Sequence, residues 1–153
     1  MKKIGYTIKA HPEGTAKAIG RELDISPKAS VEVCREVRSM TVEDAIQFLE
    51  EVISLKRPVS YRRYNGQVGH RRGKKFGAGR YPKKTAKAIL DVIKHAQHNA
   101  EYKGLDSDNM RIMHISSSRG MTVEGFMPRA HGRSTPFNHE RANIEVVLEV
   151  IEE

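Results

Sequence analysis

The sequence predicts an α+β fold, in which helices and strands come from separate runs of the chain, and three observations lead to this prediction. Three segments place apolar residues at helical spacing behind residues that favour helix starts. Two later segments, 110–116 and 143–153, alternate apolar and polar residues in the manner of strands. The connection between those two strands carries glycine and proline near its middle, which indicates the far end of a long hairpin.

The first two helices have recognisable start signals. Ser26 is suited to cap a helix and Pro27 to occupy its first position, and Val33, Cys34 and Val37 then share one face. A second helix is predicted to begin after Thr41, with Asp44 three residues on in the arrangement of a capping box. Its apolar stripe consists of Ala45, Ile46, Leu49, Val52 and Ile53, and Pro58 prevents it from continuing.

A third helix is predicted after Pro82, and it has the clearest periodicity in the chain. Its apolar positions are Ala86, Ile89, Leu90, Ile93 and Ala96. Gly104 is expected to end it, because glycine readily adopts the left-handed conformation that follows many helices.

The strands complete the expected elements. Residues 15–26 are assigned to a strand with Ile19, Leu23 and Ile25 on one side and Ala16 and Ala18 on the other. The last strand has one apolar face, made of Ile144, Val146, Leu148 and Val150. We treat residues 1–153 as a single domain with an N-terminal tail (1–14), a basic loop (56–84) and an extended hairpin (117–142).

The length of the hairpin has a consequence. Arms of about twenty residues would be roughly 60 Å long at ~3.3 Å per residue. A domain of this size is only about 30 Å across. The outer half of the hairpin is therefore expected to lie off the body of its own protein.

Charge and composition narrow the function. The net charge is +8 and the isoelectric point is near 9.7, which favours a polyanionic partner. A single cysteine, Cys34, excludes an internal disulfide and a multi-cysteine metal site, and its spacing is that of a buried apolar residue. Neither a signal peptide nor a membrane span is recognisable, so we expect a soluble protein of the cytoplasm without a membrane partner.

The basic loop 56–84 carries the strongest chemical signal, with eleven Lys or Arg and no Asp or Glu. Cationic groups neutralise phosphates, while the interleaved aromatic rings can stack on unpaired bases, so the composition indicates RNA binding. A solvated, flexible loop is the alternative interpretation. The candidate RNA-binding residues are Arg62, Arg63, Tyr64, Arg71, Arg72, Lys74, Lys75, Phe76, Arg80, Lys83 and Lys84. A second basic surface, formed by Arg21, Lys28, Arg35 and Arg38, is as consistent with a solvated helix face.

Other chemistries are poorly supported by the residues. Lys84 and Thr85 follow Lys83, where a phosphate-binding loop of the Walker type needs glycine. His114, His131 and His139 have neither metal-ligand spacing nor a convergent acid and base for a nuclease. We expect no metal, cofactor, small-molecule substrate or catalytic residue. An RNA-modifying or RNA-cleaving enzyme and a DNA-binding module are kept as rival hypotheses, although no helix-turn-helix or zinc-finger pattern is visible.

Three stretches resemble the large-subunit ribosomal protein family numbered twenty-two in bacteria, over about residues 15–152. The stretches are "SPKASVEVCREVRSMTVEDAIQFLE", "KKTAKAILDVIKHAQHNAEYKGLD" and "MPRAHGRSTPFNHERANIEVVL", of which the last is the most specific. The longer and more basic loop 56–84 is similar to the archaeal and eukaryotic branch of that family. Ser134-Thr135-Pro136 departs from the bacterial hairpin tip.

The resemblance implies three helices on a three-stranded antiparallel sheet, a ribosomal location, and a hairpin embedded in large-subunit ribosomal RNA without enzymatic activity. It implies RNA contacts along the hairpin by Arg119, Arg129, His131, Arg133 and Arg141. It also implies a tip that lines the polypeptide exit tunnel, formed by Met127, Pro128, Arg129, Ala130, His131, Gly132 and Arg133. The implied partners are that RNA, neighbouring large-subunit proteins and the nascent polypeptide.

Overall fold

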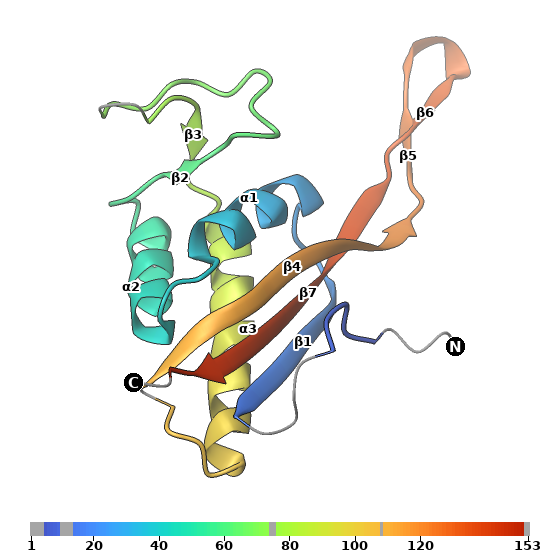
Figure 1. Ribbon diagram of the computed structural model, residues 1–153. Coiled ribbons are helices and arrows are strands. Elements are labelled where there is room, and N and C mark those ends of the chain that lie inside the picture. The colour runs from blue at the N-terminus through green and yellow to red at the C-terminus, as the bar shows by residue number, and fades with distance from the viewer. Residues whose placement is uncertain (1–4, 10–13, 74–75, 108, 152–153) are drawn as a thin grey trace.

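The structure is a computed structural model that describes residues 5–9, 14–73, 76–107 and 109–151. Figure 1 shows how its helices and strands are arranged. The elements in chain order are β1 (Thr15–Leu23), α1 (Pro27–Val37), α2 (Val42–Ile53), β2 (Val59–Ser60), β3 (Gly79–Arg80), α3 (Lys83–Tyr102), β4 (Met110–Val123), β5 (Phe126–Pro128), the short 3-10 turn η1 (Ala130–Gly132), β6 (Ser134–Pro136) and β7 (His139–Val150). The strand expected over 15–26 thus ends at Leu23, and the last strand begins four residues earlier than its alternation predicts.

The main sheet is antiparallel, and the last strand of the chain lies in its centre. Its order is β1–β7–β4, so β7 pairs with the first strand on one side and with β4 on the other. Helices α1 and α3 pack against this sheet, and α2 packs against α3 (Figure 1). The predicted α+β fold of three helices on a three-stranded antiparallel sheet is confirmed.

The core lies between the helices and one face of the sheet. Ile144, Val146 and Leu148, which the alternation placed on one face, are fully buried there. On β4, Ile112 and Ile115 join the same core although they are three residues apart, because the pairing with β7 shifts between Ile112 and His114.

The face of β1 that carries small residues packs against the core. Ala16 and Ala18 are buried, whereas Ile19 is only half-buried. Gly20 shows why small residues are needed, since a Cβ atom at this position would lie 2.7 Å from Cγ2 of Val92 on α3. The strand and this helix are therefore packed closely enough to exclude a side chain at Gly20.

The predicted helix ends are present. The Ser26 side chain accepts a hydrogen bond from the N–H of Ala29, and the Thr41 side chain accepts one from the N–H of Asp44 at 3.2 Å. Gly104 follows α3 with a φ of +73°, the conformation expected of a C-terminal cap. Cys34 is buried in α1, as its spacing predicts.

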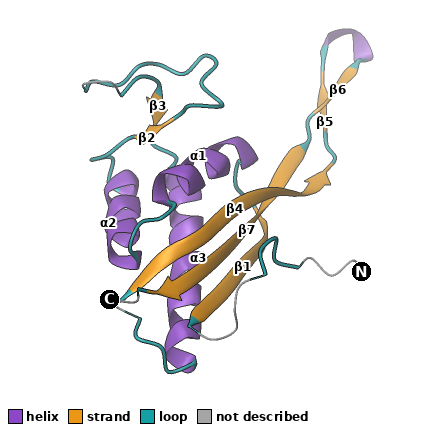
Figure 2. Cartoon of the chain, in the orientation of Figure 1, coloured by secondary structure: helices purple, strands orange, loops and turns teal. Residues whose placement is uncertain are grey.

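The basic loop is mostly irregular, but it is closed by a small ladder (Figure 2). Val59 pairs with Arg80 and Ser60 with Gly79, so the two ends of the loop lie side by side. Val59 and Tyr61 are buried against the body. Lys74 and Lys75, two of the predicted RNA-binding residues, lie outside the described residues.

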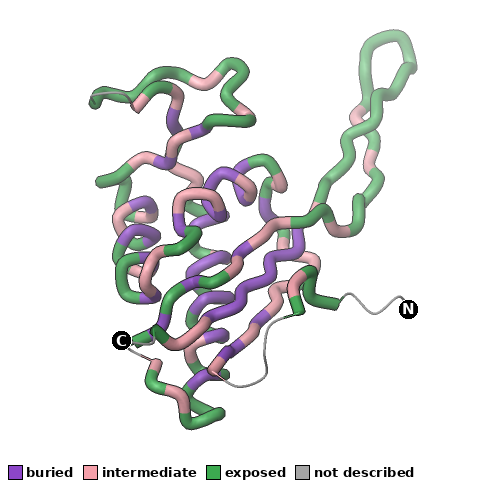
Figure 3. The backbone as a smooth tube through the Cα atoms, viewed as in Figure 1, coloured by how far each residue is buried: buried purple, intermediate pink, exposed green. Residues whose placement is uncertain are grey.

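The hairpin extends well beyond the sheet. The pairing of β4 with β7 continues to Val123 and His139, is interrupted, and resumes between β5 and β6 up to Pro128 and Ser134. Nearly all of this outer part is exposed, as Figure 3 shows. The arm is thus held by its own strand pairing and lies off the body.

The N-terminal segment crosses the other face of the sheet. The Thr7 N–H donates to Oε2 of Glu145 at 2.9 Å. Oε1 of the same carboxylate accepts from the Ser116 hydroxyl at 2.7 Å and lies 2.9 Å from Nε2 of His114. Residues 5–9 therefore contact the sheet, and they help to bury a carboxylate in the middle of β7.

Candidate nucleic-acid interface

A buried carboxylate on α1 fixes the start of the basic loop. Glu32 is fully buried, and its Oε1 accepts hydrogen bonds from the backbone N–H groups of Arg63 and Tyr64, each at 2.8 Å. Its Oε2 accepts from the N–H of Arg62 at 3.2 Å and from Nη1 of Arg35 at 3.1 Å. Glu32 is not among the predicted residues, and its only signal in the sequence is its place beside Val33 on the buried stripe of the helix.

Beyond this anchor, the loop presents its arginines to solvent. Arg62, Arg63, Arg71, Arg72 and Arg80 are all exposed. The Arg63 guanidinium lies 5.4 Å from the centre of the Tyr64 ring, and that of Arg71 lies 5.1 Å from the centre of the Tyr81 ring.

Two of the predicted loop residues also have contacts within the loop. Arg71 donates through Nε to the carbonyl of Gly79 at 3.0 Å. The half-buried Phe76 ring lies so close to Gly79 that a Cβ atom there would be 2.6 Å from Cε1 of the ring. These contacts hold the far side of the loop over its own ladder.

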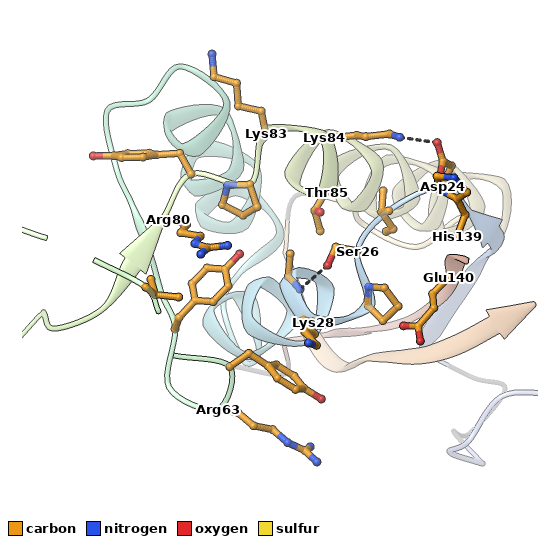
Figure 4. A pocket seen from close by; sticks show the side chains of 18 of the residues that line it. Asp24, Ser26, Lys28, Arg63, Arg80, Lys83, Lys84, Thr85, His139 and Glu140 are labelled. Carbon is orange, nitrogen blue, oxygen red and sulfur yellow. Dashed lines mark hydrogen bonds and ion pairs between the residues drawn. The ribbon is translucent and has the colours of Figure 1, made fainter. Parts of the chain in front are cut away.

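An open groove of about 990 Å³ lies between the loop, the first turns of α1 and α3, and the base of the hairpin (Figure 4). Five predicted residues line it, namely Arg63, Tyr64, Arg80, Lys83 and Lys84. Lys28 of α1, from the predicted second basic surface, lines the same groove. Residues from three separate stretches of the sequence thus form one basic surface.

The opposite rim of the groove is partly acidic, and its charges are paired. Lys84 forms an ion pair with Asp24, and that ammonium group holds the pKa of the Asp24 carboxyl below its usual range. Glu140 lies 3.9 Å from Nη1 of Arg119 across the hairpin. By contrast, the side chains of Lys28 and Lys83 have neither a hydrogen bond nor an ion pair with any residue that the structure describes.

The predicted hairpin residues are distributed along the whole arm. Arg141 lies near the body and donates through Nη1 to the Glu22 carbonyl at 3.1 Å. Further out, Arg129 donates through Nε to Oγ1 of Thr135 at 3.1 Å, which fixes its direction near the tip. Arg119, Arg129 and Arg133 are exposed.

The tip is a tight turn. His131 and Gly132 have φ values of +59° and +67°, and the Arg129 N–H donates to the Arg133 carbonyl at 2.8 Å. Met127 is half-buried, whereas the other residues of the predicted tip, Pro128 to Arg133, are exposed. The turn presents small residues and cationic side chains together at the end of the arm.

The other site types considered from the sequence find no support in the described residues. No group of three His, Cys, Asp or Glu side chains there could hold a metal ion, and His114 pairs with Glu145 on the body, away from the tip. Burial raises the pKa of the Cys34 thiol to about 12, so this cysteine is not a ready nucleophile. Among the described helices, none has the length and apolar character that a membrane crossing requires.

Comparison with known proteins gives a consistent result over nearly the whole chain. The model of the family "Ribosomal protein L22p/L17e" matches residues 18–149. The large ribosomal subunit protein uL22 of Methanocaldococcus jannaschii is 50% identical over 150 residues, which is 97% of this chain and 96% of the relative. The protein of the same name from Methanococcus vannielii is 48% identical over 151 residues, which is 97% of this chain and 98% of that relative. The chain therefore belongs to the L22p/L17e family of ribosomal proteins and is a structural component of the large ribosomal subunit, not an enzyme.

Proposed function

We propose that this protein binds large-subunit ribosomal RNA through its basic loop 56–84 and its hairpin 117–142, supports assembly of the subunit, and lines the polypeptide exit tunnel with the hairpin tip. The observation that carries the proposal is the hairpin itself. Its outer part is exposed on both arms (Figure 3), and Arg119, Arg129 and Arg133 are exposed there. Such an arm needs a partner that is both anionic and larger than the protein.

Exposed apolar side chains on the arm support an RNA partner. Phe126 is 72% exposed and Met121 is 62% exposed, although both lie within the paired strands of the hairpin. Unpaired bases offer flat apolar faces, and their phosphates offer charge, so a folded RNA covers both kinds of side chain at once.

The shape of the tip supports the tunnel role. Ala130 and Gly132 keep the turn narrow, while Arg129 and Arg133 give it positive charge. A narrow, extended element can reach between RNA segments where a folded domain would not fit. On this proposal, the body contacts RNA and neighbouring large-subunit proteins, and residues 127–133 contact the nascent polypeptide.

Site-specific photo-cross-linking tests this assignment. A photoreactive amino acid would replace Ala130 at the tip, and in a matched variant Lys94 on the exposed side of α3. Both variants are expected in large subunits on a sucrose gradient. The photoreactive residue at position 130 is expected to cross-link to ribosomal RNA and to a stalled nascent chain. The one at position 94 is not expected to reach the nascent chain. A tip position that never cross-links to nascent chains in assembled subunits would contradict the tunnel role.

A further inference from the structure

We propose that the groove between the basic loop and the first turns of α1 and α3 holds an unpaired stretch of RNA, with phosphates against Lys28 and Lys83 and a base against the ring of Tyr64. This inference rests on the proposed RNA-binding function and assigns one site and one form of RNA to it. Lys28, Arg63, Arg80 and Lys83 all line this groove. In Figure 4, Lys28 and Lys83 lie on different sides of it, and the Lys83 side chain extends outward from its edge.

The first argument is an electrostatic conflict that a bound anion would remove. The first turn of a helix favours acidic residues, because its free N–H groups carry partial positive charge. Helix α2, whose start lies outside the groove, follows this rule with Glu43 and Asp44. Helices α1 and α3 have no acidic residue in their first turns and place lysines there instead.

The lysines at these two helix starts are available to a ligand. Lys28 and Lys83 are exposed, and their side chains make no hydrogen bond or ion pair within the described part of the chain. The neighbouring Lys84 is already paired with Asp24, so its charge is balanced before any ligand arrives. One phosphate group beside Lys28 and another beside Lys83 would therefore neutralise unpaired charge at each helix start.

The second argument concerns the form of the RNA. Paired RNA hides its bases, and proteins recognise it through phosphates and sugars on a broad surface, whereas unpaired bases stack on aromatic rings. The groove is concave and has the half-buried Tyr64 in its wall. Glu32 fixes the backbone N–H of Tyr64 at 2.8 Å, so the position of this residue is set before RNA binds. A concave wall with a fixed ring suits a single strand.

The acidic rim sets the path of the strand. Asp24 and Glu140 lie on the hairpin side of the groove, where their ion pairs with Lys84 and Arg119 leave little free positive charge for a phosphate. The cationic groups of Arg63 and Arg80 belong to the opposite, loop side. The phosphate chain is therefore expected to follow the loop side, from the start of α3 past Tyr64 toward Lys28.

Binding of two labelled RNAs by the full-length chain tests the proposal. One probe is a fluorescein-labelled 12-nucleotide oligouridylate and the other is a 12-base-pair RNA duplex, each titrated at several salt concentrations and followed by fluorescence anisotropy. Lys28→Ala/Lys83→Ala is compared with Lys87→Ala/Lys94→Ala, which removes the same charge from exposed positions of α3 outside the groove.

The two double variants are expected to differ only with the single strand. Loss of two phosphate contacts should reduce the slope of log affinity against log salt by about 1.4 for the groove variant, and by much less for its control. With the duplex, both variants should lose the same amount. Equal losses with the single strand would overturn the groove as a site, and a groove-specific loss with the duplex would overturn the preference for unpaired RNA.

A second pair of variants tests the stacked base. Tyr64→Leu keeps an apolar side chain but removes the ring, and should weaken single-strand binding about 5- to 150-fold. Tyr64→Phe keeps the ring and should bind as the unaltered chain does. Indistinguishable affinities for these two variants would exclude stacking on Tyr64.

The same variants separate this inference from the function on which it depends. If the unaltered chain is absent from large subunits on a sucrose gradient, the proposed function itself fails. If it is present while the groove variant binds the single strand as its control does, only the groove proposal fails.

Discussion

Among single residues, two buried carboxylates hold the backbone of segments that lie outside the helices and the main sheet. Glu32 holds the start of the basic loop through three backbone N–H groups, and Glu145 holds residue 7 of the N-terminal segment. In each case, a charge buried on one element fixes the backbone of another. Such contacts cannot be inferred from periodicity, because an acidic residue on a helix or strand is ordinarily solvent-exposed.

Replacing Glu32 by glutamine should destabilise the protein and loosen the loop. The glutamine side chain has one acceptor oxygen, so it cannot accept from all of Arg62, Arg63, Tyr64 and Arg35. The free energy of unfolding in urea should fall by about 1–3 kcal/mol. Glu36→Gln, which breaks only a 3.8 Å contact with exposed Arg62, is the control and should cost less than about 1 kcal/mol. Equal losses in the two variants would argue against the anchoring role of Glu32.

Glu145 should make stability depend on acid pH. Burial by itself raises the pKa of Glu145, but hydrogen bonds from Thr7, Ser116 and His114 outweigh that effect and lower the pKa to about 2. Because the folded-state pKa lies below the ordinary value of 4.5, the carboxylate stabilises the fold above about pH 4.5, and this contribution is lost as the pH falls toward 2.

The pH dependence can be measured against a variant without that carboxylate. At pH 7, Glu145→Gln should be less stable than the unaltered protein by about 1–3 kcal/mol, and the difference should shrink between pH 4.5 and 2. Glu149→Gln, on the same strand and paired with exposed Arg111, provides the control. A difference between the Glu145 variant and the unaltered protein that stays constant over this range would exclude the carboxylate as its source.

Among helices and strands, the features that depend on residues close in the sequence agree with the sequence-based predictions. The caps at Ser26 and Thr41 and the glycine at the end of α3 act within one or two turns, so their chemistry is visible locally. Alternation located both strands of the hairpin for the same reason. Two features could not be predicted because they depend on residues far away in the sequence. The shift in pairing after Ile112 is determined by β7, and the need for small residues on the core-facing side of β1 is determined by α3.

The candidate site shows the same limit. The cationic and aromatic residues of loop 56–84 could be identified from composition, because their density is a local property. That Lys28 lies in the same groove as Lys83, and that Lys84 is paired with Asp24, follows only from the packing of α1 beside α3. A sequence pattern therefore predicts the class of ligand, while the three-dimensional arrangement was needed to separate free lysines from paired ones.

The close packing of β1 against α3 yields a prediction for Gly20. In Gly20→Val, the new side chain would meet Cγ2 of Val92 and Cδ1 of Leu23, for which a Cβ atom alone would come within 2.7 and 2.9 Å. The free energy of unfolding should fall by about 1–3 kcal/mol because the helix must move away. Gly66→Ala, in the open loop where a Cβ atom has no neighbour within 4 Å, should change stability by less than about 0.5 kcal/mol. A neutral Gly20→Val would show that β1 and α3 separate easily.

For the molecule as a whole, the body and the outer hairpin are built on different principles. The body has an apolar core shared by all three helices and the sheet, and none of its buried residues lies between 124 and 138. The outer hairpin has only strand pairing and exposed side chains. We therefore expect contacts with its surroundings, and not a core of its own, to fix its conformation. This division predicts that the arm can be removed without loss of the fold.

The structure shows where to cut. Val123 pairs with His139, so replacing residues 124–138 by Asn-Gly should close the two long strands with a turn suited to their twist. The free energy of unfolding of the shortened chain should lie within about 0.5 kcal/mol of that of the full chain, since no core contact is lost. It should also bind the single-stranded probe as the full chain does, because the cationic and aromatic side chains of the groove remain, although Asn138 on its rim is removed.

The consequences of the cut should appear in the ribosome. The shortened chain is expected to enter large subunits through its body and basic loop, while cross-links between this protein and a stalled nascent chain disappear. Ribosomal RNA that surrounds the missing arm should become more reactive to chemical probes, because the side chains that covered it are gone. A shortened chain that fails to fold would contradict the independence of the body. Assembled subunits with unchanged RNA reactivity would show that the arm is not embedded in RNA.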